Sequence, residues 1–284
     1  MFVRLEAMLR DTIFFTREGY GVVKYGILVI SHGSRSESWV RLVDDAVGAV
    51  RLPAEIPVFS SFLEIVEGRL IQDGITHLES LGVTNIVVVP LFVSSGSTHI
   101  DEIAYALGAK KAPQLPTDMK PFAIRARIHL TTPIDDDPVI AEIVYAKIKA
   151  LSTDPGRETV LLVGHGSIEN GFHQRWRRGL ERLAERLKRL GGFDEAASAM
   201  LLPNQIPDRM EQWRMRKPGH TVIVAPLFLS EGYFTEAVIP ERLQGYSYRY
   251  NGEALLPHPG ISRWIERQIK PFVDKMQDGT RTRL

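Results

Sequence analysis

Short apolar runs alternate along the chain with segments in which apolar residues return every three or four positions. Gly26–Ile30 and Asn85–Phe92 are nearly continuous apolar runs, a pattern typical of parallel strands buried on both faces. From Ser36 to Val50, apolar residues follow helical spacing. In the first half we predict strands over residues 26–30, 58–63, 85–92 and 122–130, and helices over 36–50, 68–81, 99–107 and 139–151.

The second half repeats this order of elements. We predict strands over residues 159–163, 196–202, 221–228 and 253–256, and helices over 172–190, 207–215, 235–243 and 261–276. Alternating strands and helices with apolar strands indicate parallel sheets covered by helices on both faces. The expected fold class is α/β, with two tandem doubly wound parallel-sheet domains and ligands at the carboxyl ends of the strands.

Two sequence landmarks occur twice, in the same order and at nearly constant spacing. Ser31-His32-Gly33-Ser34 returns as Gly164-His165-Gly166-Ser167, and Val88–Gly96 returns as Val224–Gly232. This repetition predicts an internal duplication. The expected organisation is an N-terminal extension over 1–25, a first domain over 26–137 and a second domain over 138–284, with the helix over 138–151 free to pack on the first domain.

The amino-acid composition limits the kinds of partner and metal ligand that the protein can have. Of the 284 residues, 44% are hydrophobic and 24% charged, as in soluble globular proteins, and the net charge of +1 gives no general nucleic-acid or membrane signature. The chain has no cysteine, so a bound metal must use histidine, carboxylate or carbonyl ligands. Acidic residues interrupt residues 1–25 and no apolar core follows, which argues against a signal peptide and favours a cytoplasmic protein.

Three side chains of the first half stand at predicted strand ends. His32 and Glu64 follow the first and second strands, and His99 follows the third strand after a polar loop. Each alone is commonly a structural histidine or a capping carboxylate, but together they form a sensible ligand set for Co²⁺, Fe²⁺ or Ni²⁺. The second half keeps His165, whereas Thr235 takes the place of His99. We therefore predict one working half and one degenerate half.

These motifs resemble those of a known family. Ser31–Arg35, the strand end Phe62–Glu64, and Pro90–Phe92 followed by a loop with His99 are similar to the class II chelatases of the CbiX/SirB type, in their two-domain form. These enzymes are sirohydrochlorin cobaltochelatases and ferrochelatases. The resemblance implies a tandem chelatase fold with the substrate between the halves. It also implies that His32 and His99 bind the metal and take up protons, with Glu64 assisting, although the Gly96–His99 loop is one residue longer than in many members.

The implied reaction is insertion of Co²⁺ or Fe²⁺ into sirohydrochlorin, in cobalamin or sirohaem biosynthesis. The metal, Co²⁺, Fe²⁺ or Ni²⁺, would be a substrate, and no organic cofactor is expected. The partner is a small tetrapyrrole rather than nucleic acid or membrane, and the protein is expected to be a monomer or homodimer. Because this substrate carries many carboxylates, the site is expected to supply cations and N–H donors, and the candidate residues are Arg35, Arg125, Arg127, Ser34, and Ser94, Ser95 and Ser97 of the Ser94–Thr98 backbone at a helix N-terminus. Tyr233 would offer flat apolar surface to the macrocycle.

The same motifs leave two other functions possible and exclude two more. A protoporphyrin ferrochelatase and a non-catalytic tetrapyrrole or metal carrier both remain alternatives. An α/β-hydrolase is excluded because the chain has no Gly-x-Ser-x-Gly motif. A histidine phosphatase is excluded because arginine precedes neither His32 nor His165.

Overall fold

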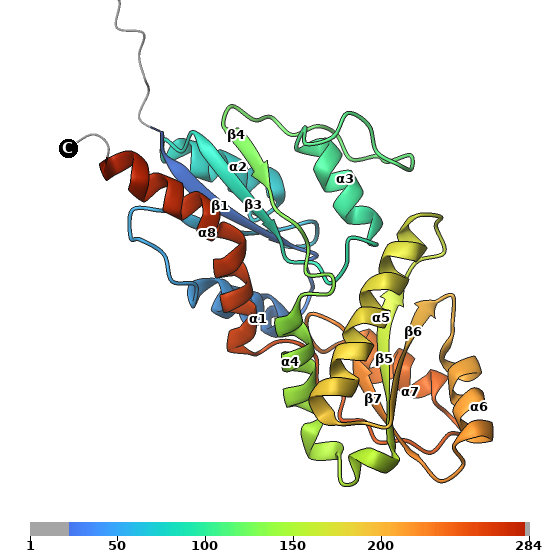
Figure 1. Ribbon diagram of the computed structural model, residues 1–284. Coiled ribbons are helices and arrows are strands. Elements are labelled where there is room, and N and C mark those ends of the chain that lie inside the picture. Colours follow the sequence, from blue (N-terminus) through green and yellow to red (C-terminus); the bar gives the residue numbers. More distant parts are fainter. Residues whose placement is uncertain (1–22, 282–284) are drawn as a thin grey trace, which may run out of the picture.

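The computed structural model describes residues 23–281, with side chains as far as residue 275, and it forms two α/β halves (Figure 1). The expected extension over residues 1–25 therefore lies almost wholly outside the described residues. Each half is built on one parallel sheet. Among residues 23–281, no helix is both long enough and apolar enough to cross a membrane.

The first sheet has four parallel strands in the order β2-β1-β3-β4. Its strands are β1 (Tyr25–Ser31), β2 (Val58–Phe62), β3 (Asn85–Pro90) and β4 (Arg127–Leu130). Its helices are α1 (Glu37–Gly48), α2 (Ile71–Ser80) and α3 (Thr98–Ala106). The Ser36 hydroxyl accepts a hydrogen bond from the Trp39 N–H and so begins α1 directly behind the His32 turn.

The second sheet has three parallel strands in the order β6-β5-β7, the same arrangement as β2-β1-β3. Its strands are β5 (Glu158–Gly166), β6 (Glu195–Leu202) and β7 (Thr221–Pro226). The helices that follow residue 137 are α4 (Pro138–Ile148), α5 (Phe172–Gly191), α6 (Ile206–Arg216), α7 (Ile239–Arg242) and α8 (Pro259–Arg281). Short 3₁₀ turns, Lys149–Leu151 and Pro155–Arg157, precede β5, and a π-helix, Phe234–Val238, precedes α7. The predicted α/β class with tandem parallel sheets is confirmed.

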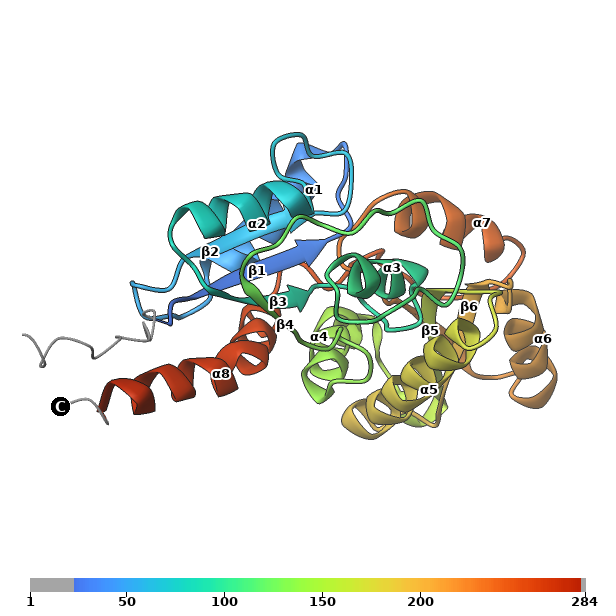
Figure 2. The ribbon, with the colours of Figure 1, turned by 90° about the horizontal axis from the view of Figure 1, so that it is seen from above.

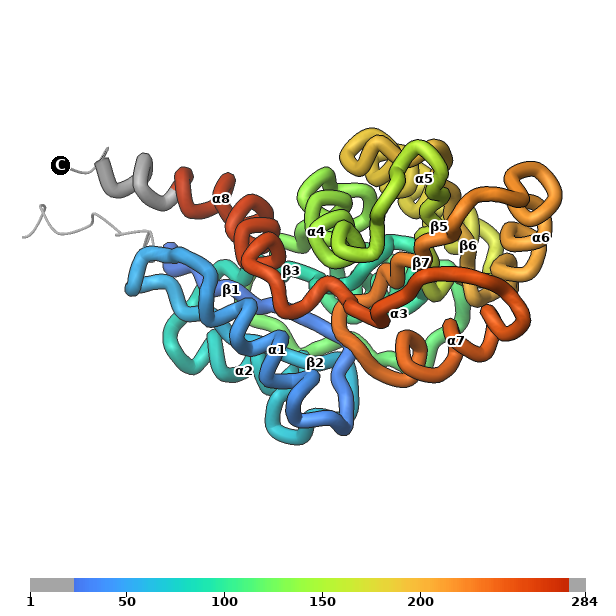
Figure 3. The backbone as a smooth tube through the Cα atoms, turned by 90° about the horizontal axis from the view of Figure 1, so that it is seen from below, coloured from blue at the N-terminus to red at the C-terminus, as the bar shows by residue number. Residues whose placement is uncertain are grey.

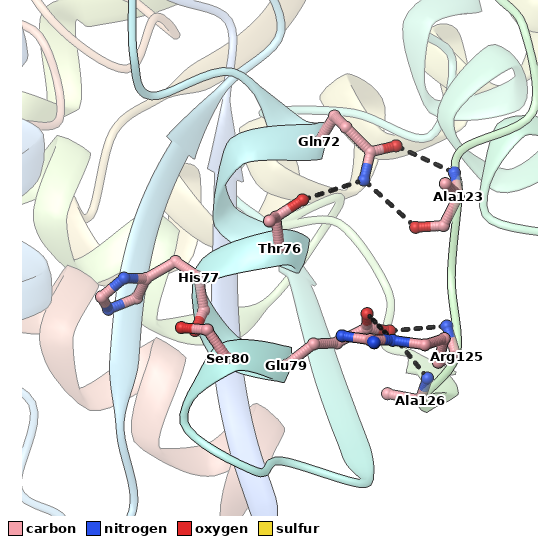
Figure 4. Close-up of polar contacts among 8 residues, drawn as sticks. All are labelled: Gln72, Thr76, His77, Glu79, Ser80, Ala123, Arg125 and Ala126. Carbon is pink, nitrogen blue, oxygen red and sulfur yellow. Dashed lines mark hydrogen bonds and ion pairs between the residues drawn. The ribbon is translucent and has the colours of Figure 1, made fainter.

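Two predicted strands differ from the structure. The strand over 122–130 is only Arg127–Leu130, because the Arg125 and Ala126 N–H groups donate to the Glu79 carboxylate of α2 instead of continuing the ladder (Figure 4). The strand predicted over 253–256 does not form. The Leu255 and Leu256 N–H groups donate to the Phe228 and Leu229 carbonyls, which lie beyond the end of β7. An isolated bridge to β7, from Arg249 to Ile223, comes earlier, and Gly252 with a φ of 75° separates it from this segment.

Alternate residues of β1 enter two different cores. Ile27 and Val29 belong to a large buried cluster that also contains residues of the second half, such as Trp176 and Leu180. Leu28 and Ile30 face the opposite way and pack with α2 and α3. This alternation is the period-two pattern of a strand buried on both faces, and it joins the halves through one continuous apolar core.

Two helices set how the halves are joined. α4 packs mainly against α5, with further contacts to α8 and β7, and the domain to which the helix over 138–151 belongs stays a prediction. α8 returns to the first half and lies beside β3 and α1 (Figure 3). There the Ser262 hydroxyl donates to the Ala46 carbonyl at 2.8 Å. The helix by which the C-terminal half covers the first sheet is therefore α8, and the domain boundary near residue 137 stays a prediction.

Candidate active site

The segments that follow β1, β3, β5 and β7 line a single cavity of about 940 Å³. Three imidazoles border it: His32 and His99 from the first half and His165 from the second. Because parallel strands end at the same edge of a sheet, the two sheets present their carboxyl ends to this cavity. A smaller hollow of about 500 Å³ lies beside it along α1 and contains no histidine.

The His32 turn depends on the glycine that follows it. Gly33 has a φ of +106°, a conformation that side chains other than glycine rarely adopt. A Cβ atom on residue 33 would also lie 2.2 Å from the Glu64 carbonyl oxygen. The Glu64 N–H also donates a hydrogen bond to the His32 carbonyl at 3.2 Å. The backbones of these two predicted site residues are thus held side by side.

His32 and His99 face each other. Their ring centroids are 5.1 Å apart and the rings meet edge to face at 75°. The nearest carboxylate oxygen of Glu64 lies 3.6 Å from His32 Nδ1, which is too long for a hydrogen bond, and the Glu64 side chain is about half exposed. The structure therefore brings the three predicted residues to one place, with the two imidazole rings in edge-to-face contact and the Glu64 carboxylate beside His32.

Burial lowers the pKa of His32, and the neighbouring His99 lowers it further, with a smaller contribution from His165. Glu64 acts in the opposite direction, but burial and the other imidazoles outweigh it. His32 is therefore mainly neutral near pH 7. A neutral imidazole is the form that can bind a metal ion or accept a proton.

His99 is the second residue of α3, behind the N-cap Ser97. Its Nδ1 lies 3.0 Å from an oxygen of Glu102, one turn further along the helix. Glu102 is not among the residues that the strand-end pattern predicts. The spacing of His99 and Glu102 is a signal that could have found this residue, because residues three apart on a helix share a face and a carboxylate there can reach the histidine.

No three-ligand cage is formed in advance. Within residues 23–281, no group of three His, Asp or Glu side chains is close enough to enclose a metal ion. The predicted metal ligands His32, His99 and Glu64 thus form an open arrangement of two imidazoles with a carboxylate at the edge. An open arrangement suits an ion that must arrive and leave more than one that is stored.

Three of the four predicted serines border the cavity, and one does not. Ser34 and Ser97 line the cavity. Ser94 also borders it, but it is buried and its hydroxyl accepts the Gly96 N–H at 3.0 Å. Ser95 is turned away: its N–H and hydroxyl donate to one oxygen of Asp135, at 2.7 and 2.9 Å, and it is not among the residues that line the cavity. Ser95 therefore anchors the loop rather than offering its hydroxyl to a substrate.

The predicted arginines do not lie in the cavity. Arg35 lines the smaller hollow beside Ser34, at the neighbouring surface. Arg127 is paired with Asn85, the first residue of β3, so it stands at the amino edge of the sheet, opposite the site. Arg125 precedes it and pairs with Glu79 (Figure 4). Placing Arg125 and Arg127 near the substrate was wrong, because a parallel strand presents only its carboxyl end to the site.

The second half supplies a wall with one histidine. His165 meets the Phe234 ring edge to face, with centroids 5.0 Å apart. Thr235, at the position equivalent to His99, is buried and exchanges hydrogen bonds with the backbone of Gly232. Tyr233 borders the cavity and its side chain is largely exposed. The second half thus offers apolar and aromatic surface, with no counterpart of the His32–His99 pair.

Two parallel-sheet halves with paired imidazoles at a shared cavity define a protein of the chelatase-like fold. A family model described as CbiX matches residues 26–151 and 159–271. The chain belongs to the CbiX family. The sirohydrochlorin cobaltochelatase of Methanothermobacter thermautotrophicus is 27% identical over 133 residues, which are 45% of this chain and 92% of that protein.

Solved structures share the fold. SirB from Bacillus subtilis, with Fe³⁺, superposes with a TM-score of 0.68 at 20% identity and covers 90% of this chain and 98% of its own. CbiX, described as the terminal enzyme for biosynthesis of sirohaem in denitrifying bacteria, gives a TM-score of 0.60 at 17% identity, covering 87% and 98%. At such identities the likeness establishes the fold, and the chemistry must be argued from the site.

Proposed function

We propose that this protein inserts a divalent metal ion, Co²⁺ or Fe²⁺, into sirohydrochlorin. The observation that carries the proposal is the His32–His99 pair, whose rings lie 5.1 Å apart at the wall of a cavity of about 940 Å³. The family membership and the name of the cobaltochelatase relative support the same reaction. A cavity of this size is at the upper end of the usual range for small-molecule sites, which suits a macrocycle.

Metal insertion requires a partly dehydrated metal ion and removal of two pyrrole protons. Neutral imidazoles serve both needs, since each can first bind the ion and then accept a proton. The lowered pKa of His32 keeps that ring available as a base and ligand at neutral pH. Glu64, 3.6 Å from His32 and partly exposed, is placed to carry a proton from the imidazole towards solvent.

The cavity wall suits the faces of the macrocycle better than its charged edge. Tyr233, Phe228 and Phe234 offer flat apolar surface, and Ser34 and Ser97 offer hydroxyls. In the described part of the chain, the residues that line the cavity include no lysine or arginine. The substrate's carboxylates would therefore lie towards the mouth, where Arg35 lines the adjoining hollow together with Ser34.

The test is an absorbance assay of the purified protein with sirohydrochlorin or protoporphyrin IX, each with Co²⁺, Fe²⁺ or Ni²⁺. We expect metal insertion into sirohydrochlorin and its loss in His99→Ala. His77→Ala is the matched control, because His77 packs on Phe59 of β2 and does not line the cavity. Insertion only into protoporphyrin IX would favour the ferrochelatase alternative. Binding without insertion would favour a carrier.

The identity of the metal, the absence of other partners, the oligomeric state and the cellular location stay predictions. The SirB structures contain Fe³⁺ or cobalt, which supports a metal substrate for this chain without choosing between ions. We expect the protein to accept Ni²⁺, to need no organic cofactor, and to bind neither nucleic acid nor membranes. The insertion assay with Ni²⁺ and without any organic cofactor tests the first two expectations, and binding assays with nucleic acid and with lipid vesicles test the last. Sedimentation of the purified protein decides between monomer and homodimer, and cell fractionation tests the cytoplasmic location.

A further inference from the structure

Glu102 lies behind His99 and outside the cavity. One carboxylate oxygen is 3.0 Å from His99 Nδ1, while Glu102 is not among the residues that line the cavity. About a quarter of its side chain is exposed, against 40% for that of His99. Glu102 is therefore placed to act on the imidazole and not on a molecule in the cavity.

The second oxygen of Glu102 is also held. It accepts a hydrogen bond from the Thr117 hydroxyl at 2.9 Å. Thr117 belongs to the long segment that passes from α3 to β4 (Figure 2). The same hydroxyl accepts the Met119 N–H at 3.1 Å, which fixes its direction. Both carboxylate oxygens thus have defined partners, and the carboxylate cannot rotate freely away from the histidine.

We propose that Glu102, held by Thr117, is a positioning residue that fixes the Nδ1–H tautomer of His99 and leaves Nε2 as the ligand for the metal substrate. An ionised carboxylate only accepts hydrogen bonds, so the nitrogen that faces it must carry the hydrogen. The lone pair then resides on Nε2. Carboxylates in this position orient histidine ligands and increase their basicity. The tautomer of His99 does not depend on the proposed function, but the effect of that tautomer on metal insertion does.

The two imidazoles are held differently. The Glu64 oxygen is 3.6 Å from His32 Nδ1, beyond hydrogen-bond distance, whereas Glu102 forms a 3.0 Å contact with His99. His99 thus has a fixed ring orientation and a fixed tautomer, and His32 has neither imposed by a carboxylate. This difference assigns His99 to holding the ion and leaves His32 freer to exchange protons.

The first test measures the tautomer and needs no substrate. Long-range ¹H–¹⁵N correlation spectra of the metal-free protein labelled at histidine nitrogens distinguish Nδ1–H from Nε2–H, with His99→Ala identifying the signals. We expect Nδ1–H in the wild type and in Glu102→Gln, whose amide oxygen still accepts the bond. In Glu102→Leu we expect a mixture. An Nε2–H tautomer in the wild type, or no change in Glu102→Leu, overturns the proposal.

The second test separates metal from macrocycle in steady-state kinetics. Glu102→Leu should raise KM for the metal about 10- to 100-fold, the usual effect of losing such a partner, and leave KM for the macrocycle unchanged. Asp101→Asn is the control, since Asp101 is on the same helix but bonds Lys110 and the Gln114 N–H. An equal change in both KM values, or the same effect in the control, contradicts a positioning role.

A further variant covers the case in which Glu102→Leu does not fold. Thr117→Val keeps the carboxylate and removes one of its two anchors. It should give a tautomer mixture and a metal KM between those of wild type and Glu102→Leu. Wild-type values for both quantities would remove Thr117 from the proposal. If the tautomer shifts as expected but no variant inserts metal, the proposed function fails while the positioning role stands.

Discussion

The backbone of Gly96 lies against the indole ring of Trp176: a Cβ atom on residue 96 would be 2.5 Å from Trp176 Cδ1 and 2.7 Å from the Phe172 carbonyl oxygen. Gly96 belongs to the loop that leads into α3 and His99, and Trp176 belongs to α5 of the other half. The second half, which has lost the equivalent of His99, therefore still shapes the loop that presents it.

This contact predicts the effect of a single methyl group. Gly96→Ala should destabilise the protein by about 1–3 kcal/mol, as expected for overpacking, and should lower chelatase activity by displacing the His99 loop. Urea unfolding and the sirohydrochlorin assay measure the two effects. Gly48→Ala is the control, because a Cβ atom there meets nothing within 4 Å. Equal behaviour of the two variants would contradict the packing argument.

A second contact between the halves predicts a loss of activity. The Arg175 Nε–H donates to the Ser95 carbonyl at 2.9 Å, and the guanidinium lies 4.4 Å above the Phe172 ring centroid. Arg175→Met should loosen the loop and reduce kcat, by up to about 100-fold if the imidazole moves by 1 Å. Arg178→Met, an exposed neighbour one turn away, should leave kcat unchanged. The steady-state assay compares the two variants.

Glu79 predicts a pH dependence of stability. Burial raises the pKa of Glu79, but hydrogen bonds from the Ala126 and Arg125 N–H groups and the Arg125 side chain outweigh it and lower the pKa overall. The folded state therefore binds the proton more weakly than the unfolded state. This contribution to stability is present above the unfolded pKa of about 4.3 and is lost as pH falls below it.

Urea unfolding between pH 7 and pH 3 tests this prediction. Glu79→Gln should be less stable at pH 7, by about 1 kcal/mol, and should show a shallower loss of stability towards low pH. Glu67→Gln, at an exposed position of the same domain, should follow the wild type. A Glu79→Gln profile parallel to that of the wild type would show that this carboxylate does not contribute to acid sensitivity.

The pKa of His32 predicts the acid limit of activity. Because burial and the neighbouring His99 lower this pKa, the ring should stay neutral, and chelation should persist, below the ordinary histidine value of about 6.5. Glu64 raises the pKa, so Glu64→Gln should move the acid limb of kcat/KM to still lower pH. The pH profile of kcat/KM measures both effects, and a shift to higher pH in Glu64→Gln would contradict the assignment.

Much of the fold could be predicted because its signals are local. Runs such as Gly26–Ile30 and Asn85–Phe92 are apolar on both faces, which indicates parallel strands whatever the rest of the chain does. The strand predicted over 253–256 does not form because Leu255 and Leu256 bond to Phe228 and Leu229, beyond the end of β7, and no local pattern distinguishes this from a continuous strand ladder. Likewise, Arg125 lies before β4 at the amino edge of the sheet, where it pairs with Glu79 of α2, a contact that the sequence pattern does not predict.

The sequence alone determined the duplication, the α/β class and the grouping of His32, Glu64 and His99, since parallel strands end at one edge and bring strand-end residues together. Only the tertiary structure decided which neighbours these residues acquire. The Glu102–His99 bond, the Ser95–Asp135 anchor and the packing of Gly96 on Trp176 depend on side-chain directions and on contacts between distant segments. Hydrophobic periodicity determines which segments form strands and helices, whereas such contacts are determined by how side chains and distant segments pack in the folded chain.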